Sequence, residues 1–143
     1  MPFVYMTIEQ AVEIHDKTVD ISGGGSKGQL DIGQLESVLE HIQNDLYYPT
    51  FEAKLTHLVF SACKFHCFQD GNKRISIALG AQFLLFNGYL FTARSFLQEM
   101  ENVSYHVAAG SIDKDLLGQI IEELVNEAEL SESTKLSIME AIT

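Results

Sequence analysis

The chain has 143 residues, and its 20 acidic residues against 9 basic ones give a formal net charge of −11. Hydrophobic residues make up 46% of the chain and charged residues 20%, which is typical of one globular domain and excludes a disordered polar chain. The negative charge excludes a general affinity for nucleic acid or for anionic membrane surfaces, because both carry charge of the same sign.

The spacing of hydrophobic residues predicts an all-α fold, a single compact domain over residues 1–143 with six to seven helices. Thr7 with Gln10 shows the spacing of a capping box, as does Asp31 with Gln34. Thr50 is the N-cap expected for the third helix. The predicted helices, caps included, cover residues 7–22, 31–43, 50–66, 75–86, 96–109, 113–128 and 132–142.

Asn87–Gly88 and Gly110 are predicted to end the fourth and fifth of these helices, since glycine readily adopts the left-handed conformation of a C-cap. Alternation typical of a strand extends no further than residues 89–92. The most apolar segment, residues 75–86, is too short to span a bilayer, and the N-terminus lacks the basic start of a signal peptide. Two cysteines are too few for a disulfide framework. We therefore expect a cytoplasmic protein.

Two patterns outside the main motif carry little weight. Residues 23–28 match GxGxxG, but no strand precedes them, so a loop between helices is the better interpretation. Four possible zinc ligands lie close together in sequence: His57, Cys63, His66 and Cys67. Their spacing is not CxxC and no second pair follows, which favours Cys63 as a small core residue. The remaining histidines lie in helical segments without a local partner and are predicted to be structural: His15, His41 and His106.

Charge is distributed unevenly along the chain. Residues 99–143 contain ten acidic residues and only two basic ones, Lys114 and Lys135. Residues 64–74 show the reverse, with three basic residues against the single acid Asp70. A short cationic segment in an acidic protein is a candidate anion-binding site.

The cationic segment contains the sequence HCFQDGNKR, residues 66–74, which combines several useful chemistries. His66 can accept a proton near neutral pH, and Asp70 is a hard oxygen ligand suited to Mg²⁺. Gly71 permits a tight turn, and Asn72 is expected to cap the helix that follows.

That helix N-terminus is expected to bind phosphate, because it presents free backbone N–H groups and the positive end of the helix dipole. Lys73 and Arg74 add two positive charges at the same place. A base, a carboxylate, N–H donors and two cations within nine residues favour a functional site over an incidental capped turn.

The segment HCFQDGNKR resembles the signature of the Fic/Doc family, HPFxDGNGR in Fic enzymes and HxFxDxNKR in the Doc (death on curing) branch. The likeness extends from the helix near Thr7 into the acidic region after Gly110. It implies a small α-helical domain with the motif in a loop between two central helices, here the third and fourth.

Three departures from the Fic pattern bear on the reaction. Cys67 stands where many members have Pro, Lys73 stands where AMP-transferring enzymes have Gly, and Ile77 stands where Fic enzymes have a second arginine. These features are similar to Doc, whose members are toxins of toxin–antitoxin pairs. The resemblance therefore implies transfer of the γ-phosphoryl group of ATP to a protein hydroxyl, as in a protein kinase.

The resemblance also implies a role for each motif residue. His66 is the general base that deprotonates the target hydroxyl, and Asp70 orients this base or holds Mg²⁺. Gly71, Asn72 and Lys73 donate hydrogen bonds to phosphate oxygens, and Arg74 neutralises the charge that develops during transfer. We thus expect His66, Asp70 and Arg74 to be catalytic, with residues 71–74 binding phosphate.

Partners follow from the same resemblance. The segment joining the second and third helices, residues 44–50, is expected to be a flap that docks the target protein, with Tyr47 and Tyr48 as contacts. The resemblance implies a target with a hydroxyl side chain, for instance on a translation factor as in the Doc branch. The inhibitory pattern of some Fic proteins is incomplete, since Met100 follows the Ser95–Glu99 match where Gly or Asn is required. We therefore expect inhibition in trans by a small antitoxin.

Two alternatives to the kinase stay open. One is a Fic-type AMP-transferase that tolerates Lys73. The other is a non-catalytic module that binds a nucleotide or an antitoxin. Lys73 and Ile77 favour the kinase over the AMP-transferase, whereas only an assay separates an enzyme from a binding module.

Overall fold

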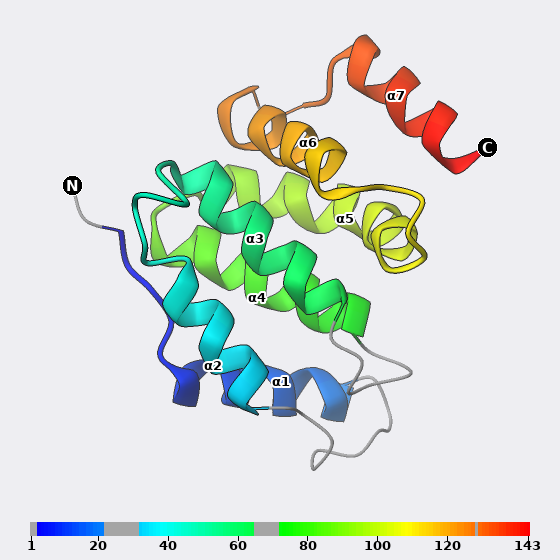
Figure 1. The fold of residues 1–143 in the computed structure, drawn as a ribbon. Coiled ribbons are helices and arrows are strands. Elements are labelled where there is room, and N and C mark those ends of the chain that lie inside the picture. Colours follow the sequence, from blue (N-terminus) through cyan, green and yellow to red (C-terminus); the bar gives the residue numbers. More distant parts are fainter. Residues whose placement is uncertain (1–2, 22–31, 65–71, 128) are drawn as a thin grey trace.

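The computed structural model describes residues 3–21, 32–64, 72–127 and 129–143, and only the backbone of residues 19–21, 72 and 73. Within these ranges the fold is all-α, as predicted (Figure 1). The helices are α1 (Ile8–Ile21), α2 (Ile32–His41), α3 (Phe51–Cys63), α4 (Asn72–Phe86), α5 (Leu90–Ala108), α6 (Lys114–Glu127) and α7 (Glu132–Ile142). No strand occurs in the part of the chain that the structure describes.

The predicted N-caps of α1 and α3 are confirmed. The Gln10 N–H donates to Thr7 Oγ1 at 3.1 Å, and the Thr7 N–H donates to Gln10 Oε1 at 2.9 Å, which completes the capping box. The Ala53 N–H donates to Thr50 Oγ1 at 3.1 Å. The predicted cap at Asp31 lies outside the described residues.

Both predicted glycine stops are confirmed. Gly88 has a φ of 86° and Gly110 a φ of 87°, the left-handed conformation that L side chains rarely adopt. After α4, the Tyr89 N–H donates to Leu84 O at 3.0 Å and the Gly88 N–H donates to Leu85 O at 3.1 Å, the pairing of a Schellman motif.

Four predicted helix boundaries are wrong, and one of them is the start of α4, which lies at Asn72 rather than at residue 75. α3 ends at Cys63 rather than His66, because the Lys64 N–H bonds Ser61 O at 3.0 Å and Phe60 O at 3.2 Å, which tightens the last turn. α2 ends at His41 rather than at residue 43, and turns follow. α5 begins at Leu90, six residues before the predicted start. The first turn is hard to predict because two of its large apolar side chains are exposed, so the hydrophobic residues there do not follow the helical period.

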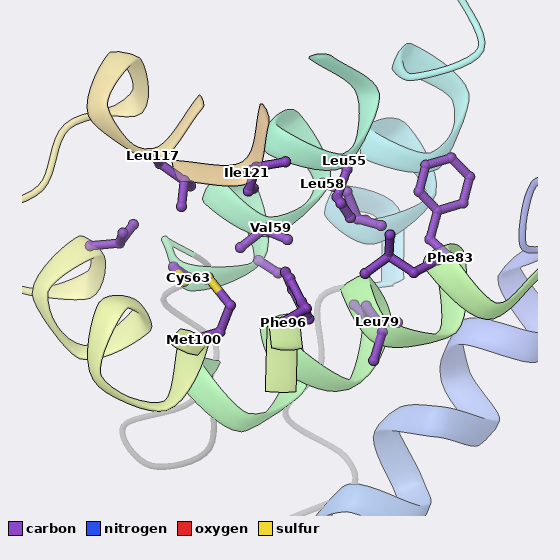
Figure 2. Packing of buried hydrophobic residues seen from close by; sticks show 14 of the residues in the cluster. Leu55, Leu58, Val59, Cys63, Leu79, Phe83, Phe96, Met100, Leu117 and Ile121 are labelled. Carbon is purple, nitrogen blue, oxygen red and sulfur yellow. The ribbon is translucent and has the colours of Figure 1, made fainter. Parts of the chain in front are cut away.

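The helices form two groups around a central pair. α3 and α4 lie side by side, α1 and α2 cover one side of this pair, α5 packs along α4, and α6 lies across α3 with α7 beyond it (Figure 1). Figure 2 shows the core between α3, α4, α5 and α6. Its central side chains are fully or almost fully buried: Leu55, Leu58, Val59, Leu79, Phe83, Phe96, Met100, Leu117 and Ile121. Burial of these side chains from water fixes the positions of the helices that flank the motif.

A buried cation fixes the connection between α2 and α3. Lys54 is fully buried, and its ammonium donates to Ile42 O and to Asp45 Oδ1, both at 2.7 Å. The ammonium also lies 5.9 Å from the ring centroid of Phe3 and 5.7 Å from that of Tyr5. The N-terminal segment, the connector and α3 therefore meet at one side chain.

Helix α7 is held to α6 by polar contacts. The Ser131 N–H donates to Glu123 Oε1 at 2.6 Å, and the Thr134 hydroxyl donates to the same carboxylate. These hydrogen bonds, chiefly that from the Ser131 backbone, hold the pKa of Glu123 below its usual range. Gln119 adds a hydrogen bond of 3.0 Å to Thr134.

Candidate functional site

The predicted site lies where α3 ends and α4 begins. His66, Asp70 and Gly71 lie outside the described residues. Asn72 is the first residue of α4, so the helix includes the residue that was expected to cap it from outside. Lys73 follows in the first turn, and Arg74 is exposed there.

The ends of α3 and α4 that flank the motif are joined inside the core. The Cys63 thiol donates to Ser76 Oγ at 3.2 Å, and both side chains are buried. Cys63 ends α3 and Ser76 lies in the second turn of α4, so residues 66–74 connect two helix ends that pack together. The core position predicted for Cys63 is confirmed.

The start of α4 is electrostatically suited to an anion. Asn72–Phe86 is a 15-residue helix with no acidic residue in its first turn. Its free backbone N–H groups and the positive end of its dipole point towards the motif side. Arg74, exposed in the first turn, adds a full charge to this end. A phosphate oxygen is the ligand that such a helix end binds best.

Ile77 shows what replaces the second arginine of the Fic pattern. Its side chain is partly buried and packs against the hydrophobic core. The position therefore contributes apolar packing where the Fic signature would contribute a guanidinium.

The predicted flap is compact between residues 44 and 48. The Tyr48 N–H donates to Asn44 O at 2.9 Å, and the Leu46 N–H donates to Asn44 Oδ1 at 2.9 Å, which closes a turn. Tyr47 is 77% exposed, as a docking contact requires. Tyr48 is half-buried, with its ring stacked on that of His57 at a centroid distance of 4.5 Å. Target docking by this segment stays a prediction.

A pair of basic side chains that sequence analysis did not connect lies beside Tyr48. Lys114 Nζ, at the start of α6, lies 3.0 Å from His57 Nδ1 in the middle of α3. Burial, followed by the charge of Lys114 and then that of His41, lowers the pKa of His57 to about 4. Burial also lowers the pKa of Lys114, against the opposing effect of Asp115. At neutral pH His57 is therefore neutral and accepts a hydrogen bond from the Lys114 ammonium.

The zinc pattern finds no support in the described part of the chain. His57 Nδ1 contacts Lys114 and Cys63 contacts Ser76, so neither of these two atoms faces a shared metal position. No group of three or more His, Cys, Asp or Glu side chains among the described residues could hold a metal ion. His66 and Cys67 lie outside those residues.

Comparison with known proteins identifies the fold family. The model of the Fic/DOC family matches residues 5–84, more than half of the chain, and this range includes α1 to α3, most of α4 and the whole motif. Neither the curated proteins nor the solved structures gave a significant match. Among the described residues, no helix combines the length and apolar character needed to cross a membrane.

Proposed function

This chain belongs to the Fic/DOC family, whose members are typically nucleotide-dependent transferases, and we propose that it is a Doc-like protein kinase. In this proposal it transfers the γ-phosphoryl group of ATP to a Ser, Thr or Tyr hydroxyl of a target protein. It would act as the toxin of a toxin–antitoxin pair in the cytoplasm.

The observation that carries the choice of reaction is the pair of residues at 73 and 77. Lys73 follows Asn72 in the first turn of α4, where AMP-transferring relatives have Gly. Ile77 packs against the core where those relatives have a second arginine. A lysine adds a cation and fills space at the phosphate site, and the loss of the arginine removes a phosphate contact. Both changes favour a nucleotide placed with its terminal phosphate nearest the motif.

The remaining motif residues fit phosphoryl transfer, which depends on positioning and on electrostatic stabilisation. His66 would remove the proton of the target hydroxyl, and Asp70 would orient His66 or hold Mg²⁺. When bound, Mg²⁺ supplies charge neutralisation between the phosphates of ATP. Gly71 and Asn72 would donate hydrogen bonds to phosphate oxygens, and Arg74 would neutralise the developing charge.

The test uses ATP labelled at either the α or the γ phosphate, with the full-length protein and a lysate as the source of target. We expect the γ label on protein and a mass increase of about 80 Da on the target, the mass of one phosphoryl group. Labelling from the α phosphate would instead establish an AMP-transferase. If neither label appears on protein, while ATP still binds, the non-catalytic module is correct.

Control of the activity would come from another protein. The Ser95–Glu99 match lies on α5, where Glu99 is exposed, and the arginine with which such a glutamate would pair is replaced by Ile77. We therefore propose inhibition by a small antitoxin rather than by this segment. Removal of residues 131–143, which carry α7, should leave activity unchanged. A many-fold rise in activity would place the inhibitor in the C-terminal helix instead.

A further inference from the structure

A second cluster of basic side chains lies between α2, α3 and the first residue of α6. A cavity of about 600 Å³ opens there, a volume in the range of small-molecule sites. Its walls include four basic side chains: His41, His57, Lys64 and Lys114. Among the described residues, no Asp or Glu lines it.

The absence of acidic side chains among its described residues distinguishes this cavity from its neighbour. That cavity, of about 650 Å³, is lined by Glu52, Asp115 and Glu122 as well as by Lys114. Lys114 lies on the wall that both cavities share. In a protein with a net charge of −11, a cavity lined only by basic and neutral groups is the place that attracts an anion.

Aromatic rings, rather than carboxylates, hold the two lysines of the cationic cavity. The ammonium of Lys64 lies 5.6 Å from the Phe60 ring centroid, and that of Lys114 lies 5.9 Å from the same ring. Lys114 also lies 5.6 Å from the Tyr48 ring centroid. No ion pair to either lysine occurs in the part of the chain that the structure describes. Both cations therefore retain charge that a ligand can neutralise.

His57 positions one of these cations, Lys114, through its Nδ1 atom. Its Nδ1 atom accepts a hydrogen bond from the Lys114 ammonium, so the ring proton of neutral His57 is on Nε2. That Nε2 atom is buried and has no hydrogen-bond partner in the described structure. Because this N–H is closed off from solvent, it does not contact an occupant of the cavity, and His57 contributes by orienting the Lys114 ammonium. Gln34 and the hydroxyls of Ser37 and Ser61 complete the polar lining.

We infer that this cavity binds a phosphate-bearing small molecule, with Lys64 and Lys114 as its counter-ions and His57 holding the Lys114 ammonium in place. A phosphate group has the charge to match two lysines and enough oxygens to accept from the lysines and the serines. The inference stands on these side chains alone and does not depend on the proposed transfer reaction. It also uses none of the residues of the start of α4.

The experiment is a titration of the ¹⁵N-labelled full-length protein with inorganic phosphate and, separately, with ATP. Two-bond ¹H–¹⁵N spectra of the histidine rings report on His57 directly, so binding at the start of α4 is not mistaken for binding in the cavity. We expect saturable shifts of the His57 signals. Shifts with both probes indicate recognition of the phosphate group itself, and shifts with ATP alone identify a nucleotide as the ligand.

Matched variants locate the counter-ions. Lys64→Gln and Lys114→Gln should each weaken binding about tenfold or more, the loss expected when a charged hydrogen-bonding partner is removed. Lys135→Gln makes the same charge change at an exposed position on α7 and should leave the dissociation constant unchanged. Arg74→Gln should leave the His57 shifts in place. Far-ultraviolet circular dichroism confirms that each variant is folded.

Two results would overturn the inference. The first is a set of His57 signals that stay fixed up to saturating phosphate and ATP. The second is binding that Lys64→Gln and Lys114→Gln weaken no more than Lys135→Gln does.

Discussion

The Lys54 ammonium lies 2.7 Å from Asp45 Oδ1, although the Lys54 side chain is fully buried and that of Asp45 is 79% exposed. The exposed carboxylate of Asp45 therefore neutralises an ammonium group that is buried away from water. Removal of the Asp45 carboxylate would leave the buried Lys54 ammonium with only the Ile42 carbonyl as a strong acceptor.

Asp45→Ala should therefore destabilise the protein by about 2 kcal/mol, because a hydrogen bond to a buried charge is lost. Urea unfolding measures the change. Lys54→Met in the Asp45→Ala background should recover much of the loss, since a flexible apolar side chain then fills the site. Glu40→Ala removes an exposed acid at the end of α2 and should change stability by no more than about 0.5 kcal/mol.

The close approach of α4 and α5 gives a second prediction. A Cβ added at Gly80 would lie 2.5 Å from Phe96 Cζ and 2.9 Å from Val59 Cγ2, both in the core. Gly80→Ala should destabilise the protein by about 1–3 kcal/mol through overpacking. Gly118→Ala on α6 is the matched control, because its Cβ would lie 3.6 Å from Thr56 Cγ2, an ordinary contact. This control should stabilise by about 0.4–1 kcal/mol, so equal effects of the two substitutions would contradict the packing.

The lowered pKa of His57 predicts a pH dependence of stability. Folded His57 takes up its proton near pH 4, and the unfolded residue does so near pH 6.5. Between these values the unfolded state binds more protons, so the free energy of unfolding rises with pH in this window. The contribution is fully present above pH 6.5 and is lost as the pH falls towards 4. Solvent screening reduces its size, because the ring is only half-buried.

Histidine NMR should show the low pKa directly, and Lys114→Gln should raise it. The rise should be partial, because burial is the larger cause and the Lys114 charge the second. A His57→Gln variant should have a flatter stability profile between pH 4 and 6.5. A wild-type His57 that titrates near 6.5 would show that the contact with Lys114 is absent in solution.

The role proposed for His66 predicts that His66→Ala abolishes transfer and leaves the fold intact. Loss of a general base typically lowers a rate by about 10²–10⁴. Circular dichroism checks the fold, and γ-phosphate labelling checks the rate. His106→Ala is the control, because this histidine lies at the end of α5 and has no proposed role. Wild-type labelling by the His66 variant would remove His66 from the mechanism.

The role proposed for Lys73 predicts a change of reaction. Lys73→Gly should open space at the start of α4 and shift activity towards AMP transfer. The new activity should remain weak, because Ile77 supplies no second arginine. Mass spectrometry of the target distinguishes a phosphoryl group from a nucleotide monophosphate. A nucleotide monophosphate added by the wild-type protein would overturn the assignment of Lys73.

The sequence predicts most of the helices because their end signals are local. The caps of α1 and α3 are hydrogen bonds between residues three apart, made by Thr7 with Gln10 and by Thr50. Gly88 and Gly110 end their helices because glycine readily adopts a positive φ. The start of α5 escapes prediction because its first turn exposes apolar side chains, so that no helical period is visible there.

Long-range pairs could not be predicted in the same way. His57 and Lys114 are 57 residues apart, and the residues around His57 in the sequence indicate only a possible zinc ligand. One signal was present, since Lys114 is an isolated cation in an acidic segment. Likewise nothing in the local pattern of α3 marks Lys54 for full burial, which depends on where the connector carries Asp45.

Lys114 stands on the wall between one cavity lined by carboxylates and another lined by bases. The one Lys114 ammonium cannot bond a ligand in each cavity as strongly as it could bond a ligand in one of them. A ligand that bonds the Lys114 ammonium in one cavity makes it unavailable to the other cavity. By thermodynamic linkage, the change in binding free energy is the same whichever ligand binds first. A ligand in either cavity that bonds the Lys114 ammonium would therefore change the affinity of the other cavity for its own ligand.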